Sequence, residues 1–211
     1  IIHHRTPQFQ EYLREVWDGL KYVHQTKNDV YLIPASGTGM LEAAVVNLLS
    51  PGDKAITVEG GKFGERWTEI CKAYGIEAHV IEVEWGTAVS AEQIKEALEK
   101  NPDAKAVFTT LSETSTGVVT DIESIGKVVK DTDAVLVVDG VSGIGTTDLQ
   151  TDNWHVDVGV SASHKGYMLP PGLAFASCSD KAYKLVEAAK CPRFYWDFRK
   201  CKKTLEGTDT P

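Results

Sequence analysis

The chain is predicted to adopt an α/β fold: three α/β/α layers around a mostly parallel sheet of about seven strands. Two observations support this prediction. From about Pro34 to Asp180, short β-favouring runs alternate with stretches of helical spacing, which is the pattern of βαβ crossovers. The run AVLVV (134–138) is continuously apolar, as expected of a strand that is buried on both faces.

Each element is predicted from its own local pattern. The β-favouring segment VYLIP (30–34) precedes six further expected strands: 54–58, 78–83, 105–110, 134–139, 156–161 and 172–177. Four stretches between them have helical spacing: 40–49, 63–75, 90–100 and 122–131. Residues 1–30 are predicted to form one amphipathic helix, because apolar residues recur there near a 3.6-residue period. Residues 191–211 are aromatic and basic but show no clear period, so no helix or strand is predicted there.

Composition narrows the class of protein. Hydrophobic residues make up 42% of the chain and charged residues 25%, as in ordinary soluble globular proteins. The net charge of −8 argues against binding along a nucleic-acid backbone. No apolar run approaches the ~20 residues that span a bilayer, and the first residues lack a signal-peptide core. We therefore expect a cytoplasmic protein that binds neither nucleic acid nor membrane. The four cysteines have no CxxC spacing, so no metal site is predicted.

The segment ASGTGMLEAA (35–44) indicates an anion site. Small residues follow a β-favouring run and lead directly into a helical stretch. Ser36 or Thr38 could cap this helix, and Gly37 would let an anion approach its free N–H groups. A plain capped helix with no ligand remains the alternative. No GK[ST] follows, so the segment is not a P-loop.

Asp139 and Lys165 are each expected near the carboxyl end of a strand. Asp139 ends the buried run 134–139, and Lys165 follows the strand 156–161. Ligands of open α/β sheets bind at this edge, and a lysine held there can act as a nucleophile. The alternatives are that Asp139 caps a helix or stabilises a turn, and that Lys165 is a surface lysine in a loop.

Two more segments follow expected strands in the same way. LSETSTG (111–117) supplies hydroxyl groups, among them that of Thr114, and EGGKFGER (59–66) places Phe63 in a glycine-rich turn. Taken singly, a polar loop and a core aromatic would explain them. Together, an anion site, a flat ring, hydroxyls, a carboxylate and a lysine match the needs of pyridoxal 5′-phosphate.

The same motifs, in this order, resemble class V of the fold type I pyridoxal-phosphate enzymes, close to alanine–glyoxylate and serine–pyruvate aminotransferases. The resemblance covers nearly the whole chain, in SGTGMLEAA, GGKFGER, SETSTGV, VVDGVSGIG, SASHKGYMLPPGLAF and TDTP. It implies that Lys165 forms the Schiff base and moves the proton, and that Asp139 keeps the pyridine nitrogen protonated. It also implies that Phe63 and Val141 pack on the two faces of the ring and that Thr114 hydrogen-bonds its 3′-oxygen.

For the phosphate, the resemblance implies a second group of residues. Ser36, Gly37 and Thr38 would hold it, and His164 would reach it unless this is simply a loop histidine. Thr210 matches a threonine that reaches the phosphate of the neighbouring subunit, which implies a homodimer with its active sites at the interface.

The resemblance also implies a domain organisation and an activity. Residues 1–30 would form a helical segment that packs on a cofactor-binding large domain, residues 31–190. Residues 191–211 would begin the connection to a C-terminal small domain that is absent, so we expect poor turnover by this chain. The expected activity is transamination from alanine or serine to glyoxylate or pyruvate. A lyase or cysteine desulfurase of the same superfamily, and a non-catalytic subunit with this fold, remain alternatives.

Overall fold

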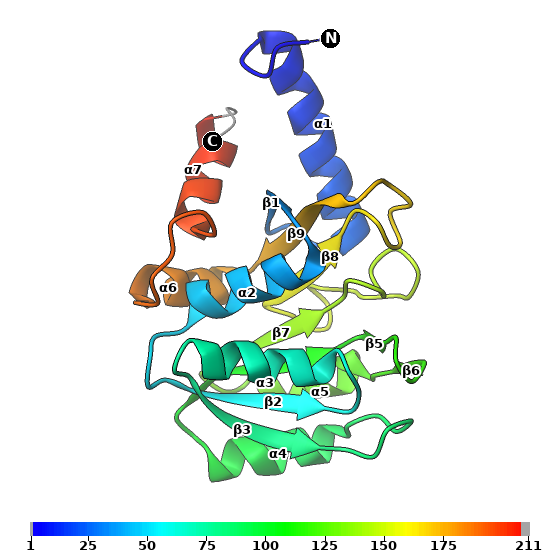
Figure 1. Ribbon diagram of the computed structural model, residues 1–211, viewed down its shortest axis with the longest axis vertical. Helices are drawn as coiled ribbons and strands as arrows, with labels where there is room; N and C mark the ends of the chain where they lie inside the picture. The colour runs from blue at the N-terminus through cyan, green and yellow to red at the C-terminus, as the bar shows by residue number, and fades with distance from the viewer. Residues whose placement is uncertain (1, 208–211) are drawn as a thin grey trace.

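The computed structural model describes residues 2–207 and has the predicted three layers (Figure 1). Its central sheet has seven strands in the order β1-β9-β8-β7-β4-β2-β3. The strands are β1 (Asp29–Ala35), β2 (Lys54–Glu59), β3 (Glu77–Glu82), β4 (Ala104–Thr110), β7 (Val135–Asp139), β8 (Val158–Ala162) and β9 (Gly172–Cys178). Only β9 runs against its neighbours, β1 and β8; the other pairs are parallel. The prediction of a mostly parallel sheet is confirmed.

Helices cover both faces of this sheet. They are α1 (Pro7–His24), α2 (Gly37–Leu48), α3 (Gly64–Ala73), α4 (Ala91–Lys100), α5 (Ile122–Val129), α6 (Asp180–Ala188) and α7 (Phe198–Gly207). Side chains of α2, α3, α6 and α7 share one buried cluster, and those of α4 and α5 share another on the opposite face. The four internal helices predicted from spacing are confirmed with shifted ends, whereas α6 was not predicted.

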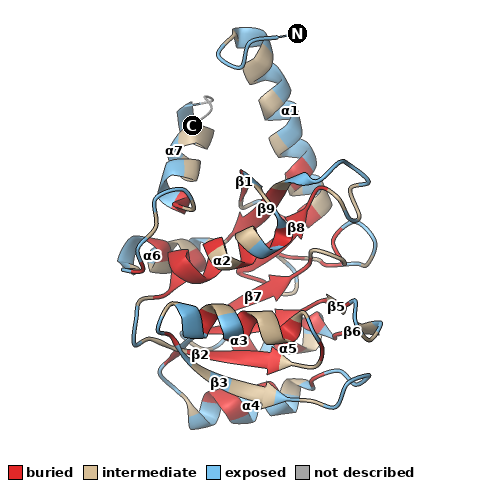
Figure 2. Ribbon diagram, viewed as in Figure 1, coloured by how far each residue is buried: buried red, intermediate tan, exposed pale blue. Residues whose placement is uncertain are grey.

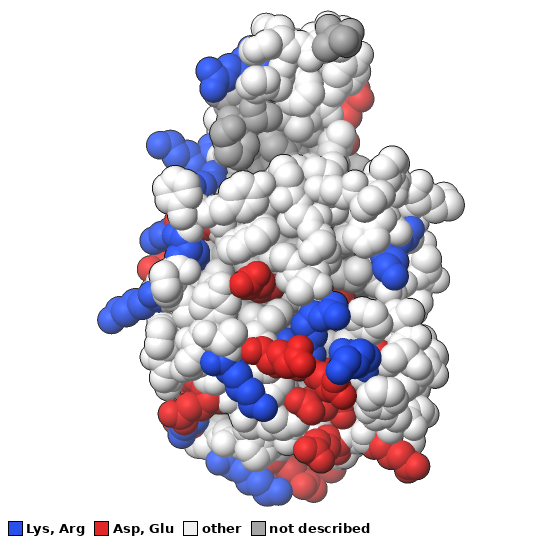
Figure 3. Space-filling view, in the orientation of Figure 1, with Lys and Arg blue, Asp and Glu red and all other residues white. Residues whose placement is uncertain are grey.

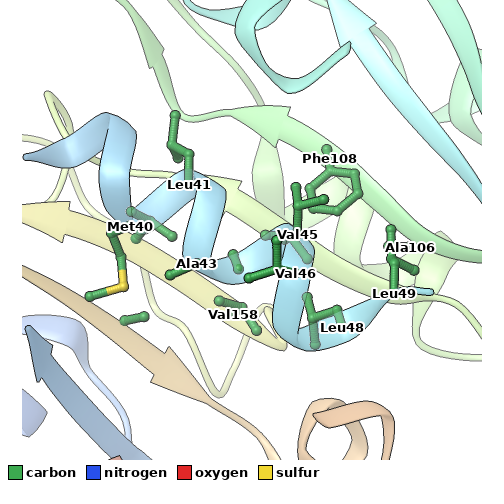
Figure 4. Close-up of a cluster of buried hydrophobic side chains, with 14 of the residues drawn as sticks. Met40, Leu41, Ala43, Val45, Val46, Leu48, Leu49, Ala106, Phe108 and Val158 are labelled. Carbon is green, nitrogen blue, oxygen red and sulfur yellow. The ribbon is translucent and has the colours of Figure 1, made fainter. Parts of the chain in front are cut away.

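The two hydrophobic clusters follow from the alternation of side chains along the strands. In β7, Val135 and Val137 join the cluster beneath α2, while Leu136 and Val138 join the one beneath α4 and α5. Figure 4 shows α2 directing its apolar side chains toward Phe108 of β4 and Val158 of β8. Because α2 is buried along most of its length, its N-terminus is held firmly at the edge of the sheet.

The two ends of the described chain project from this body. The N-terminal part of α1 and the length of α7 extend away from the sheet; the former is mostly exposed, whereas α7 mixes exposed with half-buried residues (Figure 2). No element was predicted for residues 191–211, where no clear period was found, but α7 forms at Phe198–Gly207. Phe198 at its start is fully buried, with its ring 5.0 Å from that of Tyr31. The predicted N-terminal helix is confirmed but shorter than residues 1–30.

The surface agrees with the composition. On the face in Figure 3, acidic and basic side chains are interspersed, mainly over the lower half. Within residues 2–207, none of the helices is both long enough and apolar enough to span a bilayer.

Candidate active site

A cavity of about 220 Å³ lies at the carboxyl edge of the parallel strands. Every described residue predicted for the site lines it: Ser36, Gly37, Thr38, Phe63, Thr114, Asp139, Val141, His164 and Lys165. Thr210 lies outside the described residues. A larger, more open hollow of about 1000 Å³ lies between the end of α1 and residues 145–153. None of the predicted residues within 2–207 lines that hollow, so the smaller cavity is the candidate site.

The N-terminus of α2 forms one wall of the cavity. Ser36 is the N-cap of α2, and its hydroxyl accepts a hydrogen bond from the Gly39 N–H at 3.1 Å. The first N–H groups of a helix have no partner within it, so those of Gly37 and Thr38 stay available. A Cβ at Gly37 would lie 2.9 Å from a methyl carbon of Val141. Only glycine therefore lets the loop after β7 approach the helix this closely.

Phe63 stands at the N-terminus of α3, in a turn that Glu113 holds in place. Glu113 is the last residue of β5 (Ser112–Glu113), which forms a small hairpin with β6 (Val118–Val119). Its buried carboxylate accepts hydrogen bonds from the N–H groups of Phe63 at 3.1 Å and Gly64 at 2.9 Å. A carboxylate suits the positive end of a helix dipole, so Glu113 acts as a clamp that fixes the position of Phe63.

Asp139 is the last residue of β7, and the residue is 5% exposed. Its Oδ1 atom accepts a hydrogen bond from the Val141 N–H at 2.9 Å. The pKa of Asp139 is raised to about 6, mainly by burial and in part by the charge of Glu113, while the Val141 N–H, Arg66 and Lys165 act in the opposite direction. A cationic group that binds beside such a carboxylate stabilises its ionised form.

His164 and Lys165 follow β8 in a loop that is anchored at several points. The Ser163 hydroxyl donates to the carbonyl of Pro170 at 2.7 Å and accepts from the N–H of Leu173 at 3.3 Å. The side chain of Lys165 is exposed and lines the cavity. The Nδ1 atom of His164 is buried and has no hydrogen-bond partner within residues 2–207. A buried polar atom of this kind has the capacity to bind a ligand.

The cavity also holds polar residues that were not predicted. Arg66 donates to the Thr38 hydroxyl at 2.9 Å, and the hydroxyls of Thr114 and Ser142 are 2.8 Å apart. Ser112 and Leu41 complete the lining. Position was an available signal for Ser142 alone, which lies within DGVSG shortly after β7; Arg66 lies within the GGKFGER motif but already inside α3.

Fold and site together define the class of protein. The architecture is that of the large domain of fold type I pyridoxal-phosphate-dependent transferases. A solved alanine–glyoxylate aminotransferase from Nostoc sp. superposes with a TM-score of 0.92 at 29% identity, over 96% of this chain and 54% of that one. The model of the class-V aminotransferase family matches residues 1–194. The chain belongs to this family.

Two curated relatives bear different names. The chain is 42% identical to the "Soluble hydrogenase, small subunit" of Synechococcus sp., over 100% of this chain and 56% of that protein. It is 41% identical to the L-aspartate–glyoxylate aminotransferase of Paracoccus denitrificans, over 94% of this chain and 51% of that protein. The chain thus spans about half the length of the curated relatives it matches.

Proposed function

We propose that this chain binds pyridoxal 5′-phosphate and serves transamination from alanine or serine to glyoxylate or pyruvate. One observation carries the proposal: the buried carboxylate of Asp139 and the amine of Lys165 line one cavity with the free N–H groups at the start of α2. Membership of the class-V aminotransferase family and similarity to aminotransferases named for glyoxylate support it.

The residues of the cavity fit this cofactor at each of its reactive parts. The glycine-lined start of α2 offers N–H donors to the phosphate. The unpartnered Nδ1 atom of His164 can supply or accept one further hydrogen bond. Phe63 and Val141 provide apolar surfaces for the ring, and the hydroxyl of Thr114 provides a partner for its 3′-oxygen.

The bound cofactor would supply a ring that accepts electrons, and it would carry the amino group from one substrate to the other. Asp139 would hold a proton on the pyridine nitrogen, because a cation beside this buried carboxylate favours its ionised form. Lys165 would take the cofactor's aldehyde with its amine and afterwards move the proton at the substrate α-carbon. The anchored loop around Ser163 would keep that amine in reach of both positions.

The proposal also covers the division of the chain, its location and its assembly. Residues 31–190 would be the cofactor-binding large domain, residues 1–30 a segment that packs on it, and residues 191–211 a connection toward a small domain. The protein would work in the cytoplasm as a homodimer, with Thr210 reaching the partner subunit's phosphate. Analytical ultracentrifugation tests the dimer, and a purely monomeric protein with full activity would contradict it.

The test of the function is the visible absorption band of the lysine-linked cofactor. We expect it in the purified protein, expect borohydride to remove it, and expect Lys165→Ala to lack it. Lys62→Ala, which removes an exposed lysine outside the cavity, is the matched control and should keep the band. A band that persists in Lys165→Ala would refute the assignment of Lys165. Formation of a 2-oxo acid from alanine or serine, rather than of ammonia or sulfide, separates transfer from a lyase or desulfurase activity.

A second candidate is a role as a non-catalytic subunit of a larger assembly. It is favoured by one observation, the name of the relative that is a hydrogenase small subunit. Under this alternative the protein would show no lysine-linked band and no amino transfer, and would co-purify with other chains. A catalytically active, separately purified protein would exclude it.

A further inference from the structure

Arg66 is a cation in the candidate site for which the proposed function has no use. It lies in the first turn of α3, three residues after Phe63, and lines the cavity. None of the ion pairs among residues 2–207 includes it. The nearest acid in the sequence, Glu65, pairs with Lys62 at 2.6 Å instead.

The contacts of Arg66 join two helix N-termini. One guanidinium nitrogen donates to the Thr38 hydroxyl at 2.9 Å, which ties α3 to the first turn of α2. The guanidinium carbon lies 5.1 Å from the centre of the Phe63 ring. Arg66 is therefore next to the point where α2 presents the N–H groups of Gly37 and Thr38.

The bond to Thr38 determines how that hydroxyl can be used. A hydroxyl has one donor proton and can accept as well. Because Arg66 occupies an acceptor position on Oγ1, the proton of Thr38 is left to donate to another group. A donor whose oxygen already accepts from a cation is also a stronger donor. The arrangement suits an anion at the start of α2.

We propose that Arg66 is a positioning residue for the phosphate of the cofactor: it orients the Thr38 hydroxyl and adds the positive charge that the α2 N-terminus lacks. This inference rests on the proposed function and names the residue that makes the site select a phosphorylated ligand. Arg66 does not touch the reacting atoms, so its effect falls on ligand binding.

The test compares the binding of pyridoxal 5′-phosphate with that of pyridoxal, which lacks the phosphate. Calorimetry measures both affinities without requiring the link to Lys165, and the visible band is recorded on the same samples. We expect Arg66→Gln to weaken binding of the phosphorylated ligand by roughly 10- to 100-fold, as for a lost charge-assisted contact. Binding of pyridoxal should change by less than about twofold, and Arg66→Lys should recover part of the loss.

Two controls separate this role from others. Lys62→Gln removes a positive charge from the same turn without a bond to Thr38 and should leave both affinities nearly unchanged. Thr38→Val combined with Arg66→Gln should cost little more than the worse single variant, because both act through one hydroxyl.

Several results would overturn the inference. Equal losses for both ligands would show that Arg66 only braces Phe63, and equal effects of Lys62→Gln and Arg66→Gln would show a general charge effect. Loss in Arg66→Gln of affinity for a dicarboxylic amino acid alone would assign Arg66 to the substrate. If the wild-type protein binds the phosphorylated ligand without a visible band, the proposed role of Lys165 is refuted. The role of Arg66 is then still tested by the two affinities. No preference for the phosphorylated ligand in the wild type refutes the inference itself.

Discussion

At the scale of single residues, the ionised carboxylate of Asp139 lowers the stability of the folded protein when no cation is bound beside it. Asp139 ends a fully buried strand, and burial raises its pKa to about 6. The protonated form is therefore favoured in the folded chain up to about pH 6, well above the range in which it is favoured in the unfolded chain. The stability linked to Asp139 is complete below the unfolded pKa of about 3.8 and is lost as the pH rises through about 6.

Replacing this carboxylate should stabilise the protein without cofactor. At pH 8 we expect Asp139→Asn to have a free energy of unfolding higher than that of the wild type by roughly 1–3 kcal/mol. The variant should therefore unfold at a higher denaturant concentration. The difference should vanish below pH 4. The amide oxygen can still accept from the Val141 N–H, so the loop should stay in place. Cofactor binding should weaken in the same variant. A stability difference between Asp139→Asn and the wild type that does not increase from pH 4 to pH 8 would contradict this account. Asp131→Asn, at an exposed position, is the control and should show no such increase.

At the scale of elements, two glycines in helices differ in the space around them: one is tightly packed and the other is open. Gly126 lies in α5 where a Cβ would collide with the main-chain carbonyl oxygen of Trp154. Gly19 lies in α1, and a Cβ there would meet nothing within 4 Å. The first glycine permits a close approach between a helix and a loop, whereas the second only weakens its helix.

The same substitution should therefore have opposite effects at the two positions. We expect Gly126→Ala to destabilise the protein by about 3 kcal/mol, because backbone atoms must move. Gly19→Ala should be neutral or stabilising by up to about 1 kcal/mol, through helix propensity. Urea unfolding measures both. A tolerated alanine at position 126 would mean that the α5 packing is looser than described.

Elements whose pattern is local could be predicted from sequence, and those that depend on distant partners could not. The strand 134–139 is a continuous apolar run and the helix 90–100 has a clear helical period, and both were found. Helix α7 was missed, although Phe198, Cys201 and Leu205 recur at helical spacing and pack on the core. Lysines and aromatic residues surround them in the sequence, and Phe198 is buried against Tyr31, far away in the chain.

The same limit applies to the candidate site. Residues directly after strands, such as Asp139, could be assigned because parallel strands end at one edge. Arg66 could not, since only the packing of α2 beside α3 brings it to Thr38, 28 positions earlier. The contact between the hydroxyls of Thr114 and Ser142 also spans 28 positions and had no local signal.

At the scale of the whole molecule, a buried histidine ties the first helix to the sheet. His24 is fully buried at the end of α1, and its Nε2 atom lies 2.9 Å from the Ser161 hydroxyl of β8. That hydroxyl also lies 3.1 Å from the hydroxyl of Tyr167, in the loop after Lys165. Burial lowers the pKa of His24 to about 3, so the folded chain keeps this ring neutral.

This histidine should make the protein sensitive to acid. The stability that neutral His24 provides is present above the unfolded pKa of about 6.5 and is lost as the pH falls toward about 3. Within that window, we expect the wild type to lose about 1.4 kcal/mol per pH unit relative to His24→Gln, which cannot be protonated. Denaturant unfolding from pH 7 to pH 4 measures this slope. The exposed His79→Gln should follow the wild type, and parallel curves for His24→Gln and wild type would refute the prediction.

The pairing of β1 with β9 has a consequence for how the chain assembles. Among residues 2–207, β1 is an edge strand that pairs with β9 alone, about 140 residues later along the chain. During synthesis, β2, β3, β4 and β7 can already lie side by side while residues 29–35 have nothing to join. The strand that leads into Ser36, Gly37 and Thr38 thus gains its sheet partner only after β9 emerges. The part of the protein made early is, in the order of assembly, among the last to be completed.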